Sequence, residues 1–516
     1  MTTDPVAGAT FAPLESWTAV HPAAAAAARG EIDLPTVSSQ GMPRSPALAE
    51  ALSVANRSWG NPVDVEISRW VAGAEVVVTG QQPGLLGGPM LTLVKAAAVA
   101  AEVRLLRSAG RDAVGFLWLA TGDDDLPEMR WGRVVAGEEV LEVREPGWER
   151  GGQLGGRAPL SGACAVFLEE LRGHLPGGNA TAAIDLATSC YTPTKTLGEA
   201  TAAFLARLLG GTGVIVVDAL EPEVARAGAA LVQRVLSELP ACWEALEAGV
   251  QSFRARGWPV PLRIASHKLP VFRRQGDRRE SVPTNRKNCP PVLLEEVSAH
   301  PERFLPNAWL RPLVQDAALG TSAAILGAAE LAYHVQTAAV RPIAGIGRPR
   351  WALRPHVTVV TSAERRLARQ LGVEPEHLLR LQPPVGTLPG KATRRRLERL
   401  RAGFAREIGG LVEAASGELP ALGGDVEATV RKVDAALGWL DGRVTAAATR
   451  DAEVELSRWR RLRAFLRPDG QPQERHLSVL APLLRLGPEW FEQLTAVLGP
   501  TPLGMQLLFW EEGGPW

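Results

Sequence analysis

Short apolar runs alternate with amphipathic segments along the first half of the chain. Three runs have the length and β-branched composition of buried strands: Val76–Val78, Val114–Leu119 and Val214–Val217. Apolar positions with helical spacing occur in three intervening or following segments, at about 90–106, 196–209 and 221–239. Strands that alternate with helices are typical of a parallel sheet covered by helices, so the pattern predicts an α/β core.

Two stretches interrupt this alternation and are predicted to be insertions in the core. Residues 132–178 are rich in Gly, Glu and Pro, and residues 249–301 are basic and Pro-rich. Beyond them, Val357–Val360 predicts one more strand. The most apolar long stretch, residues 317–340, carries polar and charged side chains, so it predicts a helix buried against the core rather than a membrane span.

From about residue 375 the chain becomes charged and helix-favouring. Two long segments, 394–413 and 426–466, predict helices. Turn-forming residues between them mark a connection: Gly409, Gly410, Gly417, Pro420, Gly423 and Gly424. Apolar residues of the second segment recur at spacings of three and four: Val426, Val430, Val433, Leu437, Leu440 and Val444. This spacing predicts a two-helix hairpin or coiled coil, with an ordinary helical domain as the alternative.

Composition and charge exclude several classes of protein. The 516 residues are 46% hydrophobic, and 56 basic residues balance 56 acidic ones, so no overall field attracts nucleic acid or an anionic membrane. Four cysteines occur without a CxxC pair, which favours reduced thiols in the cytoplasm, each of them a small buried side chain. The N-terminus lacks the pattern of a signal peptide. We see no Ser-His-Asp order, HExxH motif or metal-ligand cluster.

A glycine-rich loop joins the first predicted strand to the helix that follows it. The loop contains Gly80, Gly84, Gly87 and Gly88, and its spacing matches neither the P-loop nor the dinucleotide-binding fingerprint. Backbone N–H groups in such a loop can bind an anion, since no side chain keeps the ligand away. The alternative is a tight strand-to-helix turn without a ligand.

An acidic turn follows the second predicted strand. Asp123, Asp125 and Glu128 could bind an amine, accept hydrogen bonds from sugar hydroxyls or hold Mg²⁺, and the alternative is a solvated turn that caps a helix. Because ligands of parallel sheets bind at the carboxyl ends of the strands, we expect residues 79–81 and Asp123 to meet at one cavity.

The glycine loop also carries a resemblance to a known family. The segment Thr79–Met90 resembles the signature loop of the cysteine-adding enzymes of bacillithiol biosynthesis, and Lys95 stands where that family has a lysine. A second block, Phe116–Glu128, is similar to a family segment but departs from it. Gly122 replaces a glutamate, Asp124 replaces a histidine, and Trp131 replaces a second histidine farther on.

Three further blocks follow in the family's order. They are Pro306–Asp316, Gly327–Tyr333 and Leu466–Arg475. With them the resemblance extends from residue 75 to residue 475. It implies a Rossmann-like parallel sheet core with inserted segments at residues 1–375, a helical coiled-coil arm at 376–466, and a C-terminal segment, 467–516, that returns to the core.

The resemblance implies a cytoplasmic ligase. L-cysteine would be joined to the amine of glucosaminyl-malate in the last step of bacillithiol biosynthesis, with ATP or another nucleotide and Mg²⁺ activating the carboxylate, and the arm would form a homodimer contact. The altered acidic turn leaves two alternatives open. One is a diverged relative that ligates another amino acid or amine, and the other is a non-catalytic dimer that binds the thiol precursor.

Residue types and the resemblance together assign the candidate site. The catalytic candidates are Asp123, Asp125 and Lys95. The substrate-binding candidates are Thr79, Gly80, Gln81, Gln82, Gly84, Gly88, Arg311, Gln315, Asp316, Glu330 and Tyr333. Lys95 either points to the loop or lies along the surface of its helix. Arg311 needs a partner in its apolar setting, and either a malate carboxylate or Asp316 would serve.

Overall fold

The computed structural model describes most of the chain in two compact units. The described residues are 9–13, 20–32, 44–148, 152–175, 177–284, 288–373, 391–418, 423–498, 504–511 and 514–515. One unit consists of residues Met1–Ala363 together with Phe465–Trp516, and the other consists of Glu364–Ala464. The first unit is therefore formed by two separate parts of the sequence, and the second unit lies between them in the sequence.

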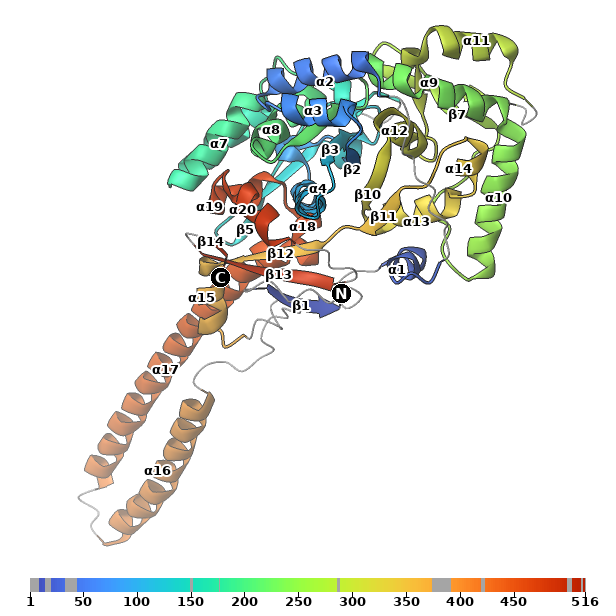
Figure 1. Cartoon of the computed structure of the whole chain (residues 1–516). Helices are drawn as coiled ribbons and strands as arrows, with labels where there is room; N and C mark the ends of the chain where they lie inside the picture. Colours follow the sequence, from blue (N-terminus) through green and yellow to red (C-terminus); the bar gives the residue numbers. More distant parts are fainter. Residues whose placement is uncertain are drawn as a thin grey trace. The chain divides into compact units, whose positions relative to one another are not determined.

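A five-stranded parallel sheet forms the centre of the first unit (Figure 1). Its strands, in spatial order, are β11 (Arg350–Leu353), β10 (Thr321–Leu326), β2 (Glu75–Gln81), β3 (Ala113–Leu119) and β6 (Val214–Asp218). Every neighbouring pair runs parallel. The sheet confirms the predicted α/β, Rossmann-like core, and three of its strands coincide with the β-branched runs.

Helices cover both faces of this sheet. On one face, α4 (Leu91–Ser108) lies so close to β3 that a Cβ atom on Gly115 would be 2.7 Å from a methyl group of Val99. On the other, Trp70 of α3 (Asp64–Val71) makes an edge contact with Phe116, with the ring centroids 5.7 Å apart. Neighbouring residues of a strand point to opposite faces, so the sheet is buried between two helical layers.

The other helices of the first unit surround the sheet. They are α1 (Pro22–Ala28), α2 (Pro46–Trp59), α5 (Leu126–Met129), α6 (Ala163–His174), α7 (Gly178–Cys190), α8 (Leu197–Leu209), α9 (Pro222–Ser237), α10 (Leu239–Ala255), α11 (Pro291–Ala299), α12 (Arg311–Leu319), α13 (Ala328–Thr337), α14 (Val340–Ile343), α18 (Gln473–His476), α19 (Leu480–Leu486) and α20 (Trp490–Val497). Two small antiparallel sheets lie mostly within the segments expected to be insertions, although β9 falls just beyond the second segment. One pairs β4 (Trp131–Ala136) with β5 (Glu139–Arg144), and the other joins β8 (Arg278–Pro283), β7 (Lys268–Gln275) and β9 (Phe304–Pro306).

The prediction of one buried helix over residues 317–340 is wrong. Gly320, with φ of +66°, ends α12 in the left-handed conformation, and β10 follows directly. β10 lies between β2 and β11, and side chains on both of its faces are buried. A strand buried on both faces has a continuous apolar sequence, which periodicity cannot separate from a buried helix.

The strand predicted at Val357–Val360 exists but does not extend the central sheet. It is β12 (His356–Thr361), which pairs in parallel with β13 (Gly504–Glu511). β1 (Ala9–Pro13) and the two-residue β14 (Gly514–Pro515) pair with β13 in antiparallel fashion. A second sheet therefore brings the two ends of the chain together.

The second unit is helical. After α15 (Ser362–Gln370), which begins in the first unit, it contains α16 (Lys391–Glu418) and most of α17 (Gly423–Leu466). Arg401 of α16 donates a hydrogen bond of 3.0 Å to Asp434 of α17, so the two helices lie against each other.

The structure of this helical unit can be compared with the predicted turn and with the predicted row of apolar residues. Gly409, Gly410 and Gly417 lie within α16 rather than in a turn, while Pro420 lies outside the described residues. Of the periodic apolar residues on α17, Leu440 is exposed. The others are half-buried, namely Val426, Val430, Val433, Leu437 and Val444.

Candidate functional site

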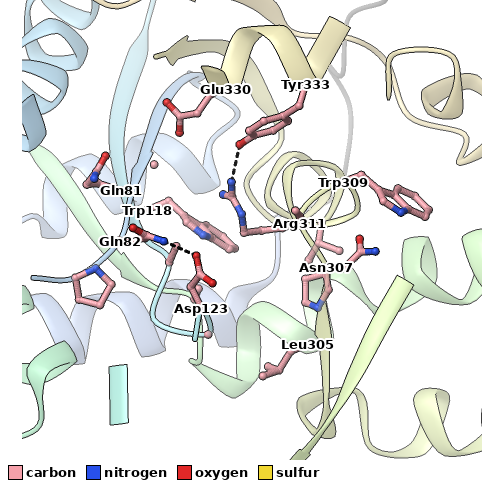
Figure 2. Close-up of a pocket in the computed structure, with 18 of the residues that line it drawn as sticks. Gln81, Gln82, Trp118, Asp123, Leu305, Asn307, Trp309, Arg311, Glu330 and Tyr333 are labelled. Atoms are coloured by element: carbon pink, nitrogen blue, oxygen red, sulfur yellow. Dashed lines mark hydrogen bonds between the residues drawn. The ribbon is translucent and has the colours of Figure 1, made fainter. Parts of the chain in front are cut away.

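A cavity of about 840 Å³ opens where β2, β3 and β10 end at their carboxyl edges. Its wall includes Gln81 at the end of β2 with Gln82 after it, Asp123 after β3, and Glu330 on the helix after β10. Figure 2 shows Glu330 and Tyr333 on one side of this cavity and Asp123 on the other, with Trp118 and Arg311 between them. The strand ends therefore bring together side chains that are far apart in the sequence, as ligand sites of parallel sheets require.

Lys95 points into this cavity instead of lying along the surface of α4. Its Nζ donates to Glu330 at 2.6 Å, to the Gly80 carbonyl at 2.8 Å and to Gln81 Oε1 at 3.2 Å. The Lys95 side chain is only 4% exposed. Burial lowers the pKa of Lys95. Burial alone would raise the pKa of Glu330, but the neighbouring Lys95 holds the pKa of Glu330 below its ordinary value. The pair thus keeps a charged group of each sign next to the end of β2.

Arg311 lies next to Tyr333, and one alternative for its partner is excluded. Its Nη2 donates to the Tyr333 hydroxyl at 2.9 Å, and among the residues that the structure describes it has no carboxylate within ion-pair distance. Asp316 is 1% exposed and accepts from Arg341 at 2.7 Å instead. Burial raises the pKa of Tyr333 to about 12. Of the two alternatives for the partner of Arg311, the pair with Asp316 is therefore wrong, and Asp316 does not line the cavity.

The acidic turn presents Asp123, but not Asp125, to the cavity. Asp123 accepts from Gln82 Nε2 at 2.6 Å and from the Asp124 amide at 2.8 Å. Asp125 is exposed and lies off the cavity wall, just before α5, whereas Glu128 lies on the wall. Burial, Asp125 and Asp123 raise the pKa of Glu128. The turn thus offers Asp123 and Glu128 to a ligand, and the position of Asp125 does not fit its predicted catalytic role.

Both predicted insertions hold this acidic turn. From the first insertion, the amides of Gly155 and Gly156 donate to the carbonyls of Asp123 and Thr121 at 2.7 and 2.8 Å. From the second, the Arg279 guanidinium donates to the Gly122 carbonyl at 2.9 Å and forms ion pairs with Asp123 and Asp124.

Arg279 therefore balances negative charge at Asp124 and at the Oδ1 atom of Asp123. No cluster of three or more His, Cys, Asp or Glu side chains suited to a metal ion occurs in the described part of the chain. Sequence reasoning missed Arg279 because the contact joins residues about 155 positions apart. The basic composition of residues 249–301 was the only signal.

Replacing Arg279 by glutamine is expected to lower the free energy of unfolding by about 1–3 kcal/mol, because the Gly122 carbonyl and the two carboxylates lose a charged donor. Adding Asp124→Asn should recover part of the loss, since groups in direct contact couple by about 0.5–3 kcal/mol. Urea unfolding of both single variants and the double variant measures this coupling. Arg278→Gln, an exposed neighbour on β8, is the control, with a change of at most about 1 kcal/mol, the upper end for exposed charged interactions. Strictly additive losses would rule out the interaction.

The glycine loop is a tight turn rather than an open anion cradle. The Gly84 amide donates to Thr201 Oγ1 at 3.2 Å, and the Gly87 amide donates to the Tyr191 hydroxyl at 2.6 Å. A Cβ atom on Gly84 would lie 2.7 Å from the Cα atom of Gly88, so only glycine permits the turn. Gly84 and Gly88 do not line the cavity, and the loop amides of Gly84 and Gly87 are already bonded.

Two other predicted substrate-binding residues also lie behind the cavity wall. Thr79 is 1% exposed and donates to the Ile325 carbonyl at 2.7 Å. Gln315 is buried, next to a much smaller pocket that Gly80 and Arg311 share. The predicted residues that line the main cavity are Gly80, Gln81, Gln82, Lys95, Asp123, Arg311, Glu330 and Tyr333.

Comparison with known proteins places these residues in a family context. The N-terminal Rossmann-like domain model of bacillithiol biosynthesis BshC matches residues 29–354, and the C-terminal coiled-coil domain model matches residues 398–510. A relative from Thermus thermophilus is 30% identical, covering 84% of this chain and 88% of its own length. A relative from Geobacillus thermodenitrificans is 28% identical, with 82% of each chain covered. Both bear the name "Putative cysteine ligase BshC".

None of the described helices is both long and apolar enough to span a membrane.

Proposed function

The chain belongs to the bacillithiol biosynthesis BshC family, and we propose that it is a ligase that joins the carboxylate of L-cysteine to the amine of glucosaminyl-malate. An amide bond forms between the carboxyl carbon and the amine nitrogen. The ammonium nitrogen loses two protons and keeps one, and one carboxyl oxygen leaves with the phosphoryl or nucleotidyl group that activated the carboxylate. On this proposal the reaction completes bacillithiol.

One observation supports this proposal above the others. A single cavity has Asp123 on one side and Tyr333 on the other, with Arg311 between them. Asp123 suits an ammonium group, and an arginine fork suits a carboxylate. A molecule with an amine at one end and carboxylates at the other therefore matches the charges across the cavity, and it would be held with its amine beside the acidic turn.

Each side chain has a proposed role. Asp123, held by Gln82, binds the amine and accepts its proton as the new bond forms. Arg311 binds a malate carboxylate with the Tyr333 hydroxyl beside it. Lys95 and Glu330 fix the position of Gln81 at the end of β2.

A carboxylate is a poor electrophile, so the proposal includes a nucleoside triphosphate as co-substrate, which would supply the activation. The residues fit this molecule only in part. The amides of Gly84 and Gly87 are already bonded within the protein, so these loop amides offer no phosphate cradle, whereas cationic side chains on the cavity wall suit phosphate oxygens. Mg²⁺ would arrive with the nucleotide.

The proposal is tested by mass spectrometry of the purified protein with cysteine, glucosaminyl-malate, ATP and Mg²⁺. We expect a product with the mass of bacillithiol that requires all three substrates. Other amino acids offered in place of cysteine test the diverged-ligase alternative. Tight binding of glucosaminyl-malate without any product would favour the non-catalytic binding protein.

A further inference from the structure

The C-terminal segment is anchored to the core by two buried side chains. Gln473 accepts from the Val359 amide at 2.8 Å and donates to the Val359 carbonyl at 3.1 Å. Glu474 accepts from both Nη atoms of Arg354 at 2.8 and 2.7 Å, and also from His356. Since Gln473 and Glu474 are at most 1% exposed, α18 is fixed against β12. The backbone of the next residue, Arg475, is therefore fixed as well.

Arg475 contrasts with these two neighbours. Its side chain lies on the wall of the main cavity and is exposed there. Within the described part of the chain, its guanidinium has neither a hydrogen bond nor an ion pair. Burial of part of the side chain and the positive charge of Arg354 lower the pKa of Arg475. Arg475 thus adds positive charge to a wall where Arg354 already lies.

Charges around the cavity are not balanced. Among the residues that the structure describes, six cationic side chains line it: Lys95, Arg263, Arg279, Arg311, Arg354 and Arg475. Three carboxylates of the same described ranges do so, those of Asp123, Glu128 and Glu330. Carboxylates pair with Lys95, Arg279 and Arg354. The remaining cations exceed what one anionic group on Arg311 would neutralise, so the cavity suits an occupant with a second anionic group.

We propose that Arg475 is a second anion-binding residue of this cavity, which holds a carboxylate or phosphate group of a substrate next to Arg354. This inference rests on the proposed function for the identity of its substrates. The anion is either the second carboxylate of glucosaminyl-malate or a phosphate of the nucleotide, and a guanidinium fork binds both chemistries. Arg475 comes from the segment beyond the helical arm, so the C-terminal segment completes the site.

Calorimetric titration of the full chain tests this role with two probes, glucosaminyl-malate alone and MgATP alone. Arg475→Gln should weaken the binding of one probe about 10-fold to 100-fold, the usual effect of losing a hydrogen bond to a charged group. Weaker binding of glucosaminyl-malate would show that Arg475 binds a carboxylate, and weaker binding of MgATP would show that it binds a phosphate. Arg475→Lys should recover part of the affinity, because it keeps the charge but not the fork.

Arg467→Gln is the matched control, since Arg467 lies in the same segment, off the cavity wall, and donates to the Gly470 carbonyl at 2.8 Å. It should leave both affinities unchanged. The inference is overturned if Arg475→Gln binds both probes as the wild type does, or if the wild type binds neither. Product formation by the wild type is a separate readout, so ligation with unaltered binding refutes Arg475 alone, and binding without product refutes the ligase.

Discussion

Glu474→Ala is expected to lower the free energy of unfolding by about 3–5 kcal/mol, which is the usual cost of removing one member of a buried ion pair. The change leaves the Arg354 guanidinium, 1% exposed, without its carboxylate. It also removes the acceptor of the Val357 amide and of His356. Urea unfolding followed by tryptophan fluorescence measures the loss. Asp469→Asn is the control, because the Asp469 side chain is 70% exposed in its pair with His476, and exposed pairs contribute at most about 1 kcal/mol.

The same ion pair has a pH signature. Burial alone would raise the pKa of Glu474, but Arg354 and His356 hold it far below the ordinary value of 4.5. A lowered carboxyl pKa contributes stability that is complete above pH 4.5 and is lost as the pH falls toward the folded-state pKa. Burial and Arg354 also lower the pKa of His356, so protonation of the unfolded chain removes further stability below pH 6.5. The difference in the free energy of unfolding between wild type and Glu474→Ala should therefore become smaller below pH 4.5. A difference that does not change with pH would show that the charge of Glu474 does not contribute to stability.

Asp123→Asn is expected to lower kcat/KM for ligation by about 10²–10³, within the usual range for the loss of a general base. The variant keeps the shape of the side chain but cannot accept the proton of the amine. Its single amide oxygen can accept from Gln82 or from the Asp124 amide, but not from both. Rates are measured from product mass at limiting glucosaminyl-malate.

Asp125→Asn is the matched control for this variant. Asp125 belongs to the same turn but is exposed and off the cavity wall, so its loss should change the rate by less than about twofold. An equal loss in both variants would mean that the turn acts only through its overall charge. A fully active Asp123→Asn enzyme would exclude the proposed base.

Much of the architecture could be predicted from local sequence patterns. β2, β3 and β6 lie where β-branched runs occur, and the long charged segments form α16 and α17. β10 was missed because an Ala-rich strand covered on both faces has no alternation of apolar and polar residues.

Site residues were predictable where they follow strands and not where they depend on distant partners. Gln81 and Asp123 meet at the cavity because parallel strands end at one edge. Asp316 pairs with Arg341 and not with Arg311, and only the packing of α12 against the region of α14 decides between them. Two amides of the glycine loop donate hydrogen bonds to Tyr191 and Thr201, which are more than 100 positions away. The motif alone could not show that these amides are unavailable to an anion.

A crystal structure with glucosaminyl-malate bound tests most directly whether the acidic turn and Arg311 act together on one substrate. We predict the amine within hydrogen-bond distance of Asp123 and a carboxylate on the Arg311 guanidinium. Sugar bound outside this cavity, or bound with its amine turned toward Arg311, would contradict the proposed site.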